Sequence, residues 1–230
     1  MALTQATLIK KISLTDDIFE LHYTLSEIKP FTAGQFITFI LSWIGWRAYS
    51  ILEIKDETIV LVIKRWSIEM WGRWGSIFLC DALVWDVFSC VWPAGHFVLS
   101  AKNTSRLFLG TGTGLVPLYS HICEWLKWAW NHKYQLVFWV RSKQDLYYLQ
   151  RFEELKNKYP STFFYHLMVS RDSAEGIIHH GYVTDFLNEK TILDFEEYYI
   201  CGAPAMIESC EKKLLELKVP IENIFFEKYA

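Results

Sequence analysis

The sequence predicts two successive folds: an all-β region, either a barrel or a sandwich, and then an α/β region with a mainly parallel sheet. Two observations lead to this prediction. Up to about residue 100, short runs rich in β-branched and aromatic residues are separated by turn-forming residues, and closely spaced strands of this kind are typical of all-β folds. From about Asn103 onward, strand-like runs alternate with helix-like runs, which is the pattern of βαβ units.

The individual elements follow from the same hydrophobic patterns. In the all-β region we expect strands over Thr7–Leu14, Ile18–Thr24, Gln35–Leu41, Thr58–Ile63 and Val87–Val91. In the α/β region we expect strands over Arg106–Leu109, Tyr134–Val140, Thr162–Val169, Glu197–Ile200 and Ile224–Phe226, with helices from Leu115, across Leu146–Lys158 and across Pro204–Leu217. The polar segment Ala101–Ser105 is the expected hinge, so the predicted domains are residues 1–103 and 104–230.

Composition narrows the function classes. About half of the 230 residues are apolar and the charged residues are scattered, so no basic stripe indicates a nucleic-acid partner. The densest apolar stretch, Phe36–Trp46, is far shorter than the roughly 20 residues of a membrane-spanning helix and is expected to be a buried strand with its turn. Met1–Lys10 lacks the features of a secretory signal, so we expect a cytoplasmic protein. We also expect it to be a monomer.

The cysteines argue against a metal centre. There are five, widely spaced, with no C-x-x-C pair and no iron-sulfur run. We therefore expect no metal site and mostly free buried thiols, and only Cys201 has a neighbourhood that suggests more than packing.

The segment Leu107–Pro117 combines an apolar strand, alternating glycines and the start of a helix with Pro117 in its first turn. Such a turn can present bare backbone N–H groups and a helix N-terminus to a phosphate. Gly110, Gly112 and Gly114 match neither G-x-G-x-x-G nor the nucleotide triphosphate loop. A glycine-rich turn that binds nothing therefore remains an alternative.

Two further segments carry suitable chemistry. In Arg47-Ala-Tyr49-Ser50, an arginine can hold a pyrophosphate, a tyrosine offers a flat face to a ring system, and a serine hydroxyl can bond a ring heteroatom. Alone, this segment would more often be an ordinary strand edge. Cys201-Gly-Ala-Pro-Ala-Met206 lies at a strand end entering a helix, where ligands of open α/β sheets bind, so Cys201 is expected near the same crevice as Gly112.

Together these segments resemble the ferredoxin-NADP reductase family, which includes flavodoxin reductases and the reductase components of oxygenases. The resemblance covers nearly the whole chain. The family's R-x-Y-S, G-x-G-S, G-T-G-[IL]-x-P and C-G-x-P-x-M motifs correspond to Arg47–Ser50, Gly75-Ser76, Gly112–Pro117 and Cys201–Met206. The resemblance implies an N-terminal antiparallel FAD-binding β-barrel followed by a parallel-sheet NAD(P)-binding α/β domain.

For the flavin, the resemblance implies roles for residues of the first domain. Arg47 would hold the pyrophosphate of FAD, Tyr49 would stack on the flavin ring, and Ser50 would hydrogen-bond near its N5 atom. The remaining residues expected to complete the pyrophosphate cradle are Lys64, Gly75 and Ser76.

For the nicotinamide cofactor, the resemblance implies roles for residues of the second domain. Gly112, Thr113 and Gly114 would bind its pyrophosphate, and Cys201 would lie beside the nicotinamide, with Gly202 and Met206 also in the cofactor site. Near the end of the sequence, Glu227 would assist proton transfer and Tyr229 would cover the flavin, unless this end is frayed. The residues expected to select NADPH over NADH are Ser170 and Arg171, which resemble the family's 2′-phosphate site, and Arg141, which stands where an NAD site favours an acid.

The resulting functional prediction is a flavoenzyme that passes hydride from NAD(P)H to FAD and then single electrons to a separate carrier such as ferredoxin or flavodoxin. Ser50, Cys201, Glu227 and Tyr229 are the expected catalytic residues. Two alternatives remain. One is an accessory FAD-binding subunit of a larger electron-transfer complex. The other is a non-catalytic scaffold whose flavin site is blocked by Trp71 and Trp74.

The tryptophans depart from the family pattern. All eleven lie between Trp43 and Trp139, and several stand where the family has glycine, namely Trp71, Trp74, Trp85, Trp92 and Trp139. Trp125 and Trp128 have another interpretation, as an apolar stripe on a helix. Our hypothesis is that the source organism reads UGA codons as glycine and that the gene was translated here with UGA read as tryptophan.

Overall fold

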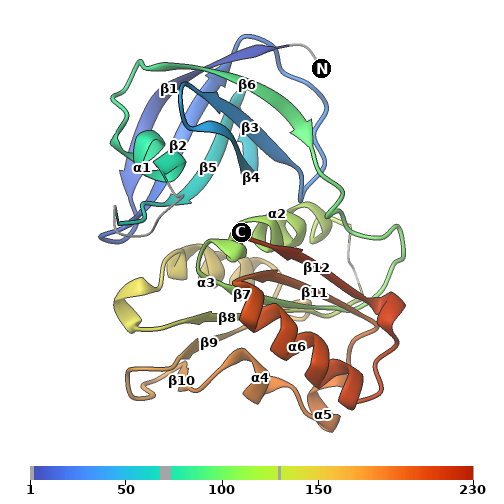
Figure 1. Ribbon diagram of the computed structural model, residues 1–230. Coiled ribbons are helices and arrows are strands. Elements are labelled where there is room, and N and C mark those ends of the chain that lie inside the picture. Colours follow the sequence, from blue (N-terminus) through green and yellow to red (C-terminus); the bar gives the residue numbers. More distant parts are fainter. Residues whose placement is uncertain (1–2, 68–73, 129–130, 230) are drawn as a thin grey trace. The chain divides into compact units, whose positions relative to one another are not determined.

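The computed structural model describes residues 3–67, 74–128 and 131–229. The chain divides into two compact units, Met1–Leu99 and Ser100–Ala230, and each is described here by itself (Figure 1). The division falls within a few residues of the predicted hinge at Ala101–Ser105.

The first unit is a closed antiparallel barrel, as predicted (Figure 1). Its strand order is β1-β2-β5-β4-β3-β6, and the unit also contains a short helix, α1. The bounds of these elements are β1 Thr4–Ser13, β2 Ile18–Leu25, β3 Phe36–Leu41, β4 Gly45–Lys55, β5 Thr58–Lys64, α1 Trp74–Asp81 and β6 Val87–Ala94. The sequence patterns did not identify β4 or α1 as separate elements, because β4 mixes charged and apolar residues without a clean alternation.

The barrel closes because its strands alternate inward-facing apolar residues with outward-facing residues. In β3, Ile37, Phe39 and Leu41 are buried while the residues between them are partly exposed. Phe39 lies at the centre of an aromatic cluster, with ring centroids 5.2 Å from Tyr23 and 5.9 Å from Phe88. These rings fill the interior and hold the strands at a fixed register.

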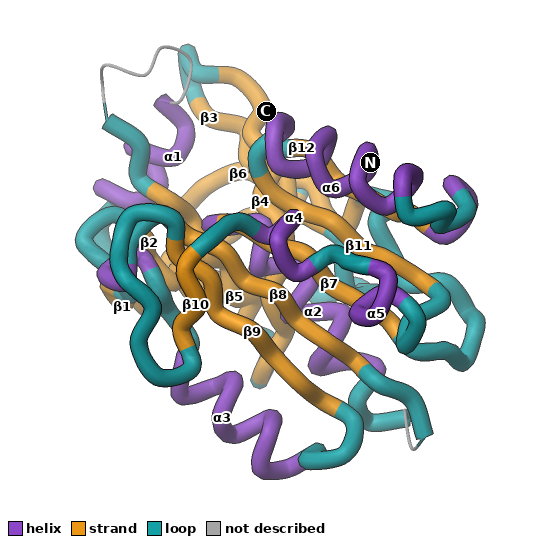
Figure 2. The backbone as a smooth tube through the Cα atoms, turned by 90° about the horizontal axis from the view of Figure 1, so that it is seen from below, coloured by secondary structure: helices purple, strands orange, loops and turns teal. Residues whose placement is uncertain are grey.

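The second unit is a six-stranded parallel sheet with the order β10-β9-β8-β7-β11-β12, also as predicted (Figure 2). Figure 1 shows α2 and α3 on one face of the sheet and α4, α5 and α6 on the other. The strands are β7 Arg106–Thr111, β8 Tyr134–Val140, β9 Phe163–Val169, β10 Ile178–His180, β11 Glu197–Gly202 and β12 Ile224–Lys228. The helices are α2 Leu115–Trp125, α3 Leu149–Lys158, α4 Val183–Phe186, α5 Glu189–Ile192 and α6 Pro204–Glu216.

Two details of this unit differ from the sequence-based expectation. Helix α3 begins at Leu149 rather than Leu146, because Leu146 is extended and Tyr148 adopts a left-handed φ of 62°. The short elements β10, α4 and α5 were not predicted, since each has only three or four residues and shows no readable periodicity.

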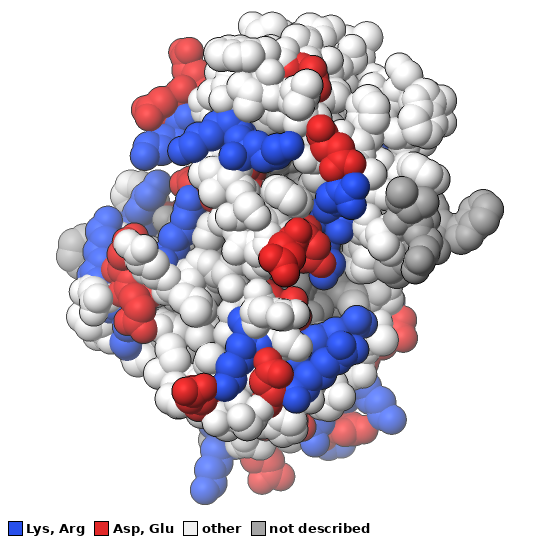
Figure 3. Space-filling view, turned by 90° about the vertical axis from the view of Figure 1, so that its left-hand side faces the viewer, with Lys and Arg blue, Asp and Glu red and all other residues white. Residues whose placement is uncertain are grey.

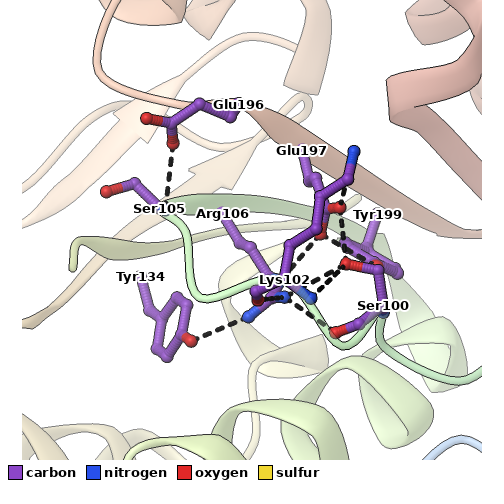
Figure 4. Close-up of polar contacts among 8 residues, drawn as sticks. All are labelled: Ser100, Lys102, Ser105, Arg106, Tyr134, Glu196, Glu197 and Tyr199. Atoms are coloured by element: carbon purple, nitrogen blue, oxygen red, sulfur yellow. Dashed lines mark hydrogen bonds and ion pairs between the residues drawn. The ribbon is translucent and has the colours of Figure 1, made fainter.

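A buried ion pair anchors the amino-terminal ends of the strands (Figure 4). Arg106 Nε donates to Glu197 Oε2 at 2.9 Å, and neither side chain is exposed. The same guanidinium donates to the hydroxyl of Tyr134 at 2.8 Å and to the backbone oxygen of Ser100 at 3.0 Å. This network ties the first residues of the unit to β7, β8 and β11. It lies at the end of the sheet opposite the carboxyl ends of the strands, where α/β folds bind ligands.

The structure also bears on possible membrane and metal sites. In the part of the chain that the structure describes, no helix is long and apolar enough to cross a bilayer. Within those same residues, no group of three or more His, Cys, Asp or Glu side chains could hold a metal ion. The five cysteines are free thiols, and Cys123 alone among them is partly exposed.

On the face drawn in Figure 3, basic and acidic side chains are interspersed rather than gathered into a patch of one sign.

Candidate functional site

The glycine turn of the second unit connects β7 to α2. Leu107, Phe108 and Leu109 are fully buried in the sheet, so the chain leaves the core at Thr111. It then makes a single 3-10 turn over Gly112–Gly114 and enters α2 at Leu115. The first turn of α2 therefore lies directly beyond the carboxyl end of a central strand, and the N–H of Leu115 donates to the carbonyls of the glycine turn.

Two of these glycines are required for different reasons. Gly112 has a φ of 54°, and a Cβ added there would meet no atom within 4 Å, so its backbone is both left-handed and open. Gly114 is the opposite case, because a Cβ would lie 2.2 Å from the carbonyl oxygen of Cys201. The turn thus rests directly on the end of β11, while the space beside the Cα of Gly112 is open.

The end of β11 completes this arrangement. Cys201 is paired in register with Gly110 of β7 on one side and with Glu227 of β12 on the other. Gly202 has a φ of 145°, and a Cβ there would lie 2.4 Å from Thr111 Cγ2. The structure therefore brings together the glycine turn and the cysteine segment, which are about 90 residues apart in sequence.

Cys201 lies in a buried polar group. Burial raises the pKa of its thiol well above the usual range, the carboxylate of Glu227 raises it further, and a hydrogen bond with the Tyr229 side chain partly opposes the shift. Tyr229 also donates its backbone N–H to the carbonyl of Gly202 at 3.2 Å. Cys201, Glu227 and Tyr229 thus converge, and the thiol is neutral at neutral pH.

One neighbour of the glycine turn was missed by sequence reasoning. The buried hydroxyl of Tyr147 donates to the carbonyl oxygen of Gly112 at 3.0 Å. Burial raises the pKa of Tyr147, and the nearby thiol of Cys201 raises it further. No motif marks Tyr147, because its contact depends on how the segment after β8 folds back over the turn.

Met206 packs against Gly202 in the same group. It lies in the first turns of α6, half-buried, and its Cε would be 3.1 Å from a Cβ at Gly202. Its sulfur accepts a contact from the thiol of Cys210 at 3.6 Å. Met206 therefore packs against the glycine backbone and contributes shape rather than a polar group.

Arg141 and Arg171 lie just beyond the carboxyl ends of β8 and β9. The backbone N–H of Arg171 donates to the carbonyl of Arg141 at 2.9 Å, so the segments that follow β8 and β9 run side by side. Both side chains are exposed, and neither guanidinium has a hydrogen-bond or ion-pair partner among residues 3–67, 74–128 and 131–229. Lys143, by contrast, pairs with Glu175 at 2.6 Å. Ser170, half-buried, directly precedes Arg171.

The barrel carries a second group of candidate residues. Arg47 and Tyr49 point to the same face of β4, and Ser50 is buried on the other face, in register with Phe36. A Cβ at Gly75, the second residue of α1, would lie 2.5 Å from Arg47 Cγ and 3.2 Å from the Tyr49 hydroxyl. The bare backbone of α1 therefore packs directly against both side chains.

The structure shows the environment of Tyr49, Arg47 and Ser76 in this group. Burial raises the pKa of Tyr49, and Cys80 raises it further, while the positive charge of Arg47 lowers it. Arg47 Nη1 donates to the carbonyl of Trp46 at 2.8 Å. Ser76, the next residue of α1, is buried. A guanidinium, a phenol ring and uncovered backbone thus meet, which are groups suited to a pyrophosphate and a planar ring.

Lys64 does not join this group by its described contacts. Its ammonium lies 2.8 Å from the carboxylate of Asp17 and 5.5 Å from the ring centroid of Trp66. Trp74, the first residue of α1, is 42% exposed, whereas Trp71 lies outside the described residues.

Comparison with protein families identifies the second unit. Residues 108–212 match the family described as "Oxidoreductase NAD-binding domain". Among curated proteins, one subunit of the Na(+)-translocating NADH-quinone reductase of Neisseria meningitidis is 32% identical over 147 residues. This match covers 60% of the chain and 36% of the relative, so the chain spans only about a third of that protein's length.

Comparison with solved structures identifies the fold of the whole chain. The cytochrome P450 reductase of Amycolatopsis superposes with a TM-score of 0.86 and 24% identity, covering 99% of this chain and 69% of that one. A ferredoxin NADP+ reductase of Neisseria gonorrhoeae, with bound FAD and NADP, gives a TM-score of 0.83 and 17% identity over 99% of both chains. Residues 108–212 therefore match the oxidoreductase NAD-binding domain family, and the whole chain shares the two-unit fold of these reductases.

Proposed function

We propose that this protein binds NAD(P)H on its α/β unit and FAD on its barrel, and passes hydride from the nicotinamide to the flavin. Single electrons then go to a separate carrier such as ferredoxin or flavodoxin. The observation that carries the proposal is the glycine turn resting on Cys201, with Glu227 and Tyr229 beside it. A relative of the same fold holds both FAD and NADP.

The glycine turn is suited to the pyrophosphate of the nicotinamide cofactor. Gly112 leaves its backbone open, and the N-terminus of α2 follows directly. The dipole of a helix N-terminus favours a negative charge there. Thr113 lies between the two glycines and offers a hydroxyl in the same turn.

The group around Cys201 would orient the nicotinamide ring. Because the thiol is neutral, it provides a small polarisable surface and a weak hydrogen-bond donor rather than a nucleophile. Glu227 can hold a proton on its carboxyl group, and Tyr229 provides an aromatic face. FAD, when bound, supplies the conversion of a two-electron hydride into single electrons.

The barrel group would hold the flavin. Arg47 is placed to bind the pyrophosphate through its guanidinium, Tyr49 to stack on the ring, and Ser50 to hydrogen-bond near the flavin N5 atom. Gly75 and Ser76 would line the pyrophosphate at the start of α1. Lys64 could contribute only if a phosphate drew it away from Asp17.

The two unpaired arginines support a preference for NADPH over NADH. A 2′-phosphate needs fixed positive charge, and Arg141 and Arg171 provide two guanidinium groups whose backbones are hydrogen-bonded to each other. Ser170 would add a hydroxyl beside them.

The visible absorption spectrum tests the proposal. Purified protein is incubated with FAD, desalted, and then mixed anaerobically with NADPH. We expect a retained flavin spectrum that bleaches with NADPH. A chain that retains flavin but shows no bleaching with either nicotinamide would contradict the hydride transfer, and a colourless chain would favour a non-catalytic scaffold.

A matched pair of arginine variants sharpens this test. Arg47→Ala removes one charged hydrogen-bond donor, which is worth about 1.5–3 kcal/mol, and should weaken FAD binding about 10- to 100-fold. Arg65→Ala is the control, because Arg65 is also in the barrel but pairs with Asp81 at 2.6 Å. Equal losses in the two variants would argue against a specific role for Arg47.

A second candidate function is that of an electron-transfer module within a larger complex. The observation that favours it is the match to a subunit of the Na(+)-translocating NADH-quinone reductase, of which this chain spans only 36%. We propose the stand-alone, cytoplasmic monomer as the first alternative to test. If the purified chain oxidises NADPH with ferricyanide at a steady rate, it works alone; if it does so only with a co-purified partner, it is a subunit.

A further inference from the structure

Trp85 occupies a backbone position that normally requires glycine. It is the third residue of the turn Leu83–Asp86, which is closed by a hydrogen bond from Asp86 N–H to the Leu83 carbonyl at 3.0 Å. Its φ is 83°. The third position of a type II turn has a φ near +80°, and glycine is favoured there because a side chain clashes with the backbone.

Trp43 repeats this arrangement in another turn. It is the third residue of Leu41–Ile44, where Ile44 N–H donates to the Ser42 carbonyl at 2.7 Å and to the Leu41 carbonyl at 3.3 Å, and its φ is 55°. This turn connects β3 to β4. A bulky residue with positive φ is an outlier unless packing holds it there. Little packing holds these residues there, because the side chains of Trp43 and Trp85 are 78% and 72% exposed, although Trp43 contacts the rings of Trp74 and Phe78.

Other described tryptophans are also poorly accommodated. Tryptophan is highly buried on average, yet Trp46 is 65% exposed and Trp128, which lies beyond α2 and so forms no stripe with Trp125, is 72% exposed. Trp92 and Trp139 show the converse defect, since their indole N–H groups are buried without a hydrogen-bond partner among the described residues. A buried indole N–H usually finds a partner.

We infer that the natural protein has glycine at positions 43 and 85, and that tryptophan stands there because UGA codons that mean glycine in the source were translated as tryptophan. A single codon explains why tryptophan stands in both turns, whereas it does not bear on the other non-glycine residues with positive φ, Asp56, Glu57, Tyr148 and Lys218. The same reading extends to the remaining tryptophans. It doubles the eleven glycines of the chain and leaves no tryptophan.

This inference changes how the barrel surface is understood. Trp43 lies against Trp74 and Phe78, with ring centroids 6.4 and 6.5 Å apart, and these three rings help to line an apolar pocket of about 370 Å³. An exposed aromatic group of this kind would ordinarily indicate a partner-binding site. With glycine at positions 43 and 74, two of these three rings would be absent, and no side chain would precede Gly75 in α1.

The gene and the natural protein test the inference directly. We expect UGA at codons 43 and 85, and peptides from the source organism with the mass of glycine at both positions. UGG codons, or peptides with the mass of tryptophan, would overturn the inference.

Thermal unfolding of recombinant variants tests the structural argument independently. Trp85→Gly and Trp43→Gly each remove a side chain from a residue with positive φ, which relieves backbone strain and should raise Tm by about 2–8 °C. Leu83→Gly is the matched control, because Leu83 is equally exposed, at 72%, and belongs to the same turn without a positive φ. It should not raise Tm. If Trp85→Gly lowers Tm as Leu83→Gly does, or prevents folding, the structural argument fails.

Discussion

The glycine turn of the α/β unit and the start of α1 in the barrel differ in which residues surround their glycines. In the α/β unit, glycine stands at 110, 114 and 202, where a Cβ would come within 3.0 Å or less of a neighbouring atom, and at 112, where φ is positive. In the barrel, Gly75 packs against Arg47 and Tyr49, but tryptophan stands next to it at 74 and in the turn at 43. The fold is complete in both units. The difference therefore lies in residue identity, and it teaches that the same kind of fold can form whether glycine or tryptophan stands beside a candidate binding site.

The largest expected effect is at Gly114. In Gly114→Ala the new Cβ would lie 2.2 Å from a backbone carbonyl, which cannot move away as a side chain can. Overpacking of this kind costs up to about 3 kcal/mol, so NADPH affinity should fall about 100-fold if the strain is placed on the turn. Fluorescence titration with NADPH measures it, and circular dichroism checks that the unit is folded. Unchanged affinity would mean that the turn does not bind the cofactor.

Gly112 distinguishes binding from backbone strain. Gly112→Ala and Gly176→Ala both place a side chain at positive φ in open space, so each should cost about 1–2 kcal/mol of stability. Only Gly112→Ala should also weaken NADPH binding. Equal effects of the two variants on NADPH affinity would remove the functional distinction between these turns.

Arg171 tests cofactor selection next to the α/β turn. Arg171→Ala removes a charged donor worth about 1.5–3 kcal/mol, so the Kd for NADPH should rise about 10- to 100-fold. The Kd for NADH should stay unchanged, because NADH lacks the 2′-phosphate. A parallel loss for both nicotinamides would point to a general defect rather than to selection.

Gly75 is the barrel counterpart of Gly114, and its effect should be smaller. A Cβ at Gly75 would meet Arg47 Cγ at 2.5 Å, which is a side-chain atom that can shift. Gly75→Ala should therefore weaken FAD binding by about 10-fold, or 1.4 kcal/mol. The measurement is flavin fluorescence during titration. A loss larger than that of Gly114→Ala for NADPH would reverse the comparison between the two sites.

Tyr147 should give the smallest effect. Tyr147→Phe removes the hydrogen bond to the Gly112 carbonyl, worth about 0.5–1.5 kcal/mol, and keeps the ring packed. The KM for NADPH should rise about 2- to 10-fold while kcat stays unchanged, because the turn is positioned less well but the reacting groups are untouched. A fall in kcat at constant KM would assign Tyr147 to a different role.

Local patterns in the sequence were sufficient for much of this protein. The all-β character of the first unit, the parallel sheet and the strand-turn-helix segment around Gly112 follow from periodicity and glycine placement, which act over a few residues. The choice of a barrel over a sandwich came from the family resemblance. The approach of Cys201 to the glycine turn also followed, because the carboxyl ends of parallel strands meet at one edge. By itself, the sequence therefore determined the fold class and the family motifs.

Tertiary structure decided what depends on contacts between distant segments. It paired Lys64 with Asp17, placed the Tyr147 hydroxyl on the Gly112 carbonyl, and left Arg141 and Arg171 without a side-chain partner among the described residues. It also set the positive φ of Trp43 and Trp85, since barrel closure fixes where the chain must turn. Such contacts follow from strand order and register, which join residues tens of positions apart and leave no local signal for a sequence pattern to carry.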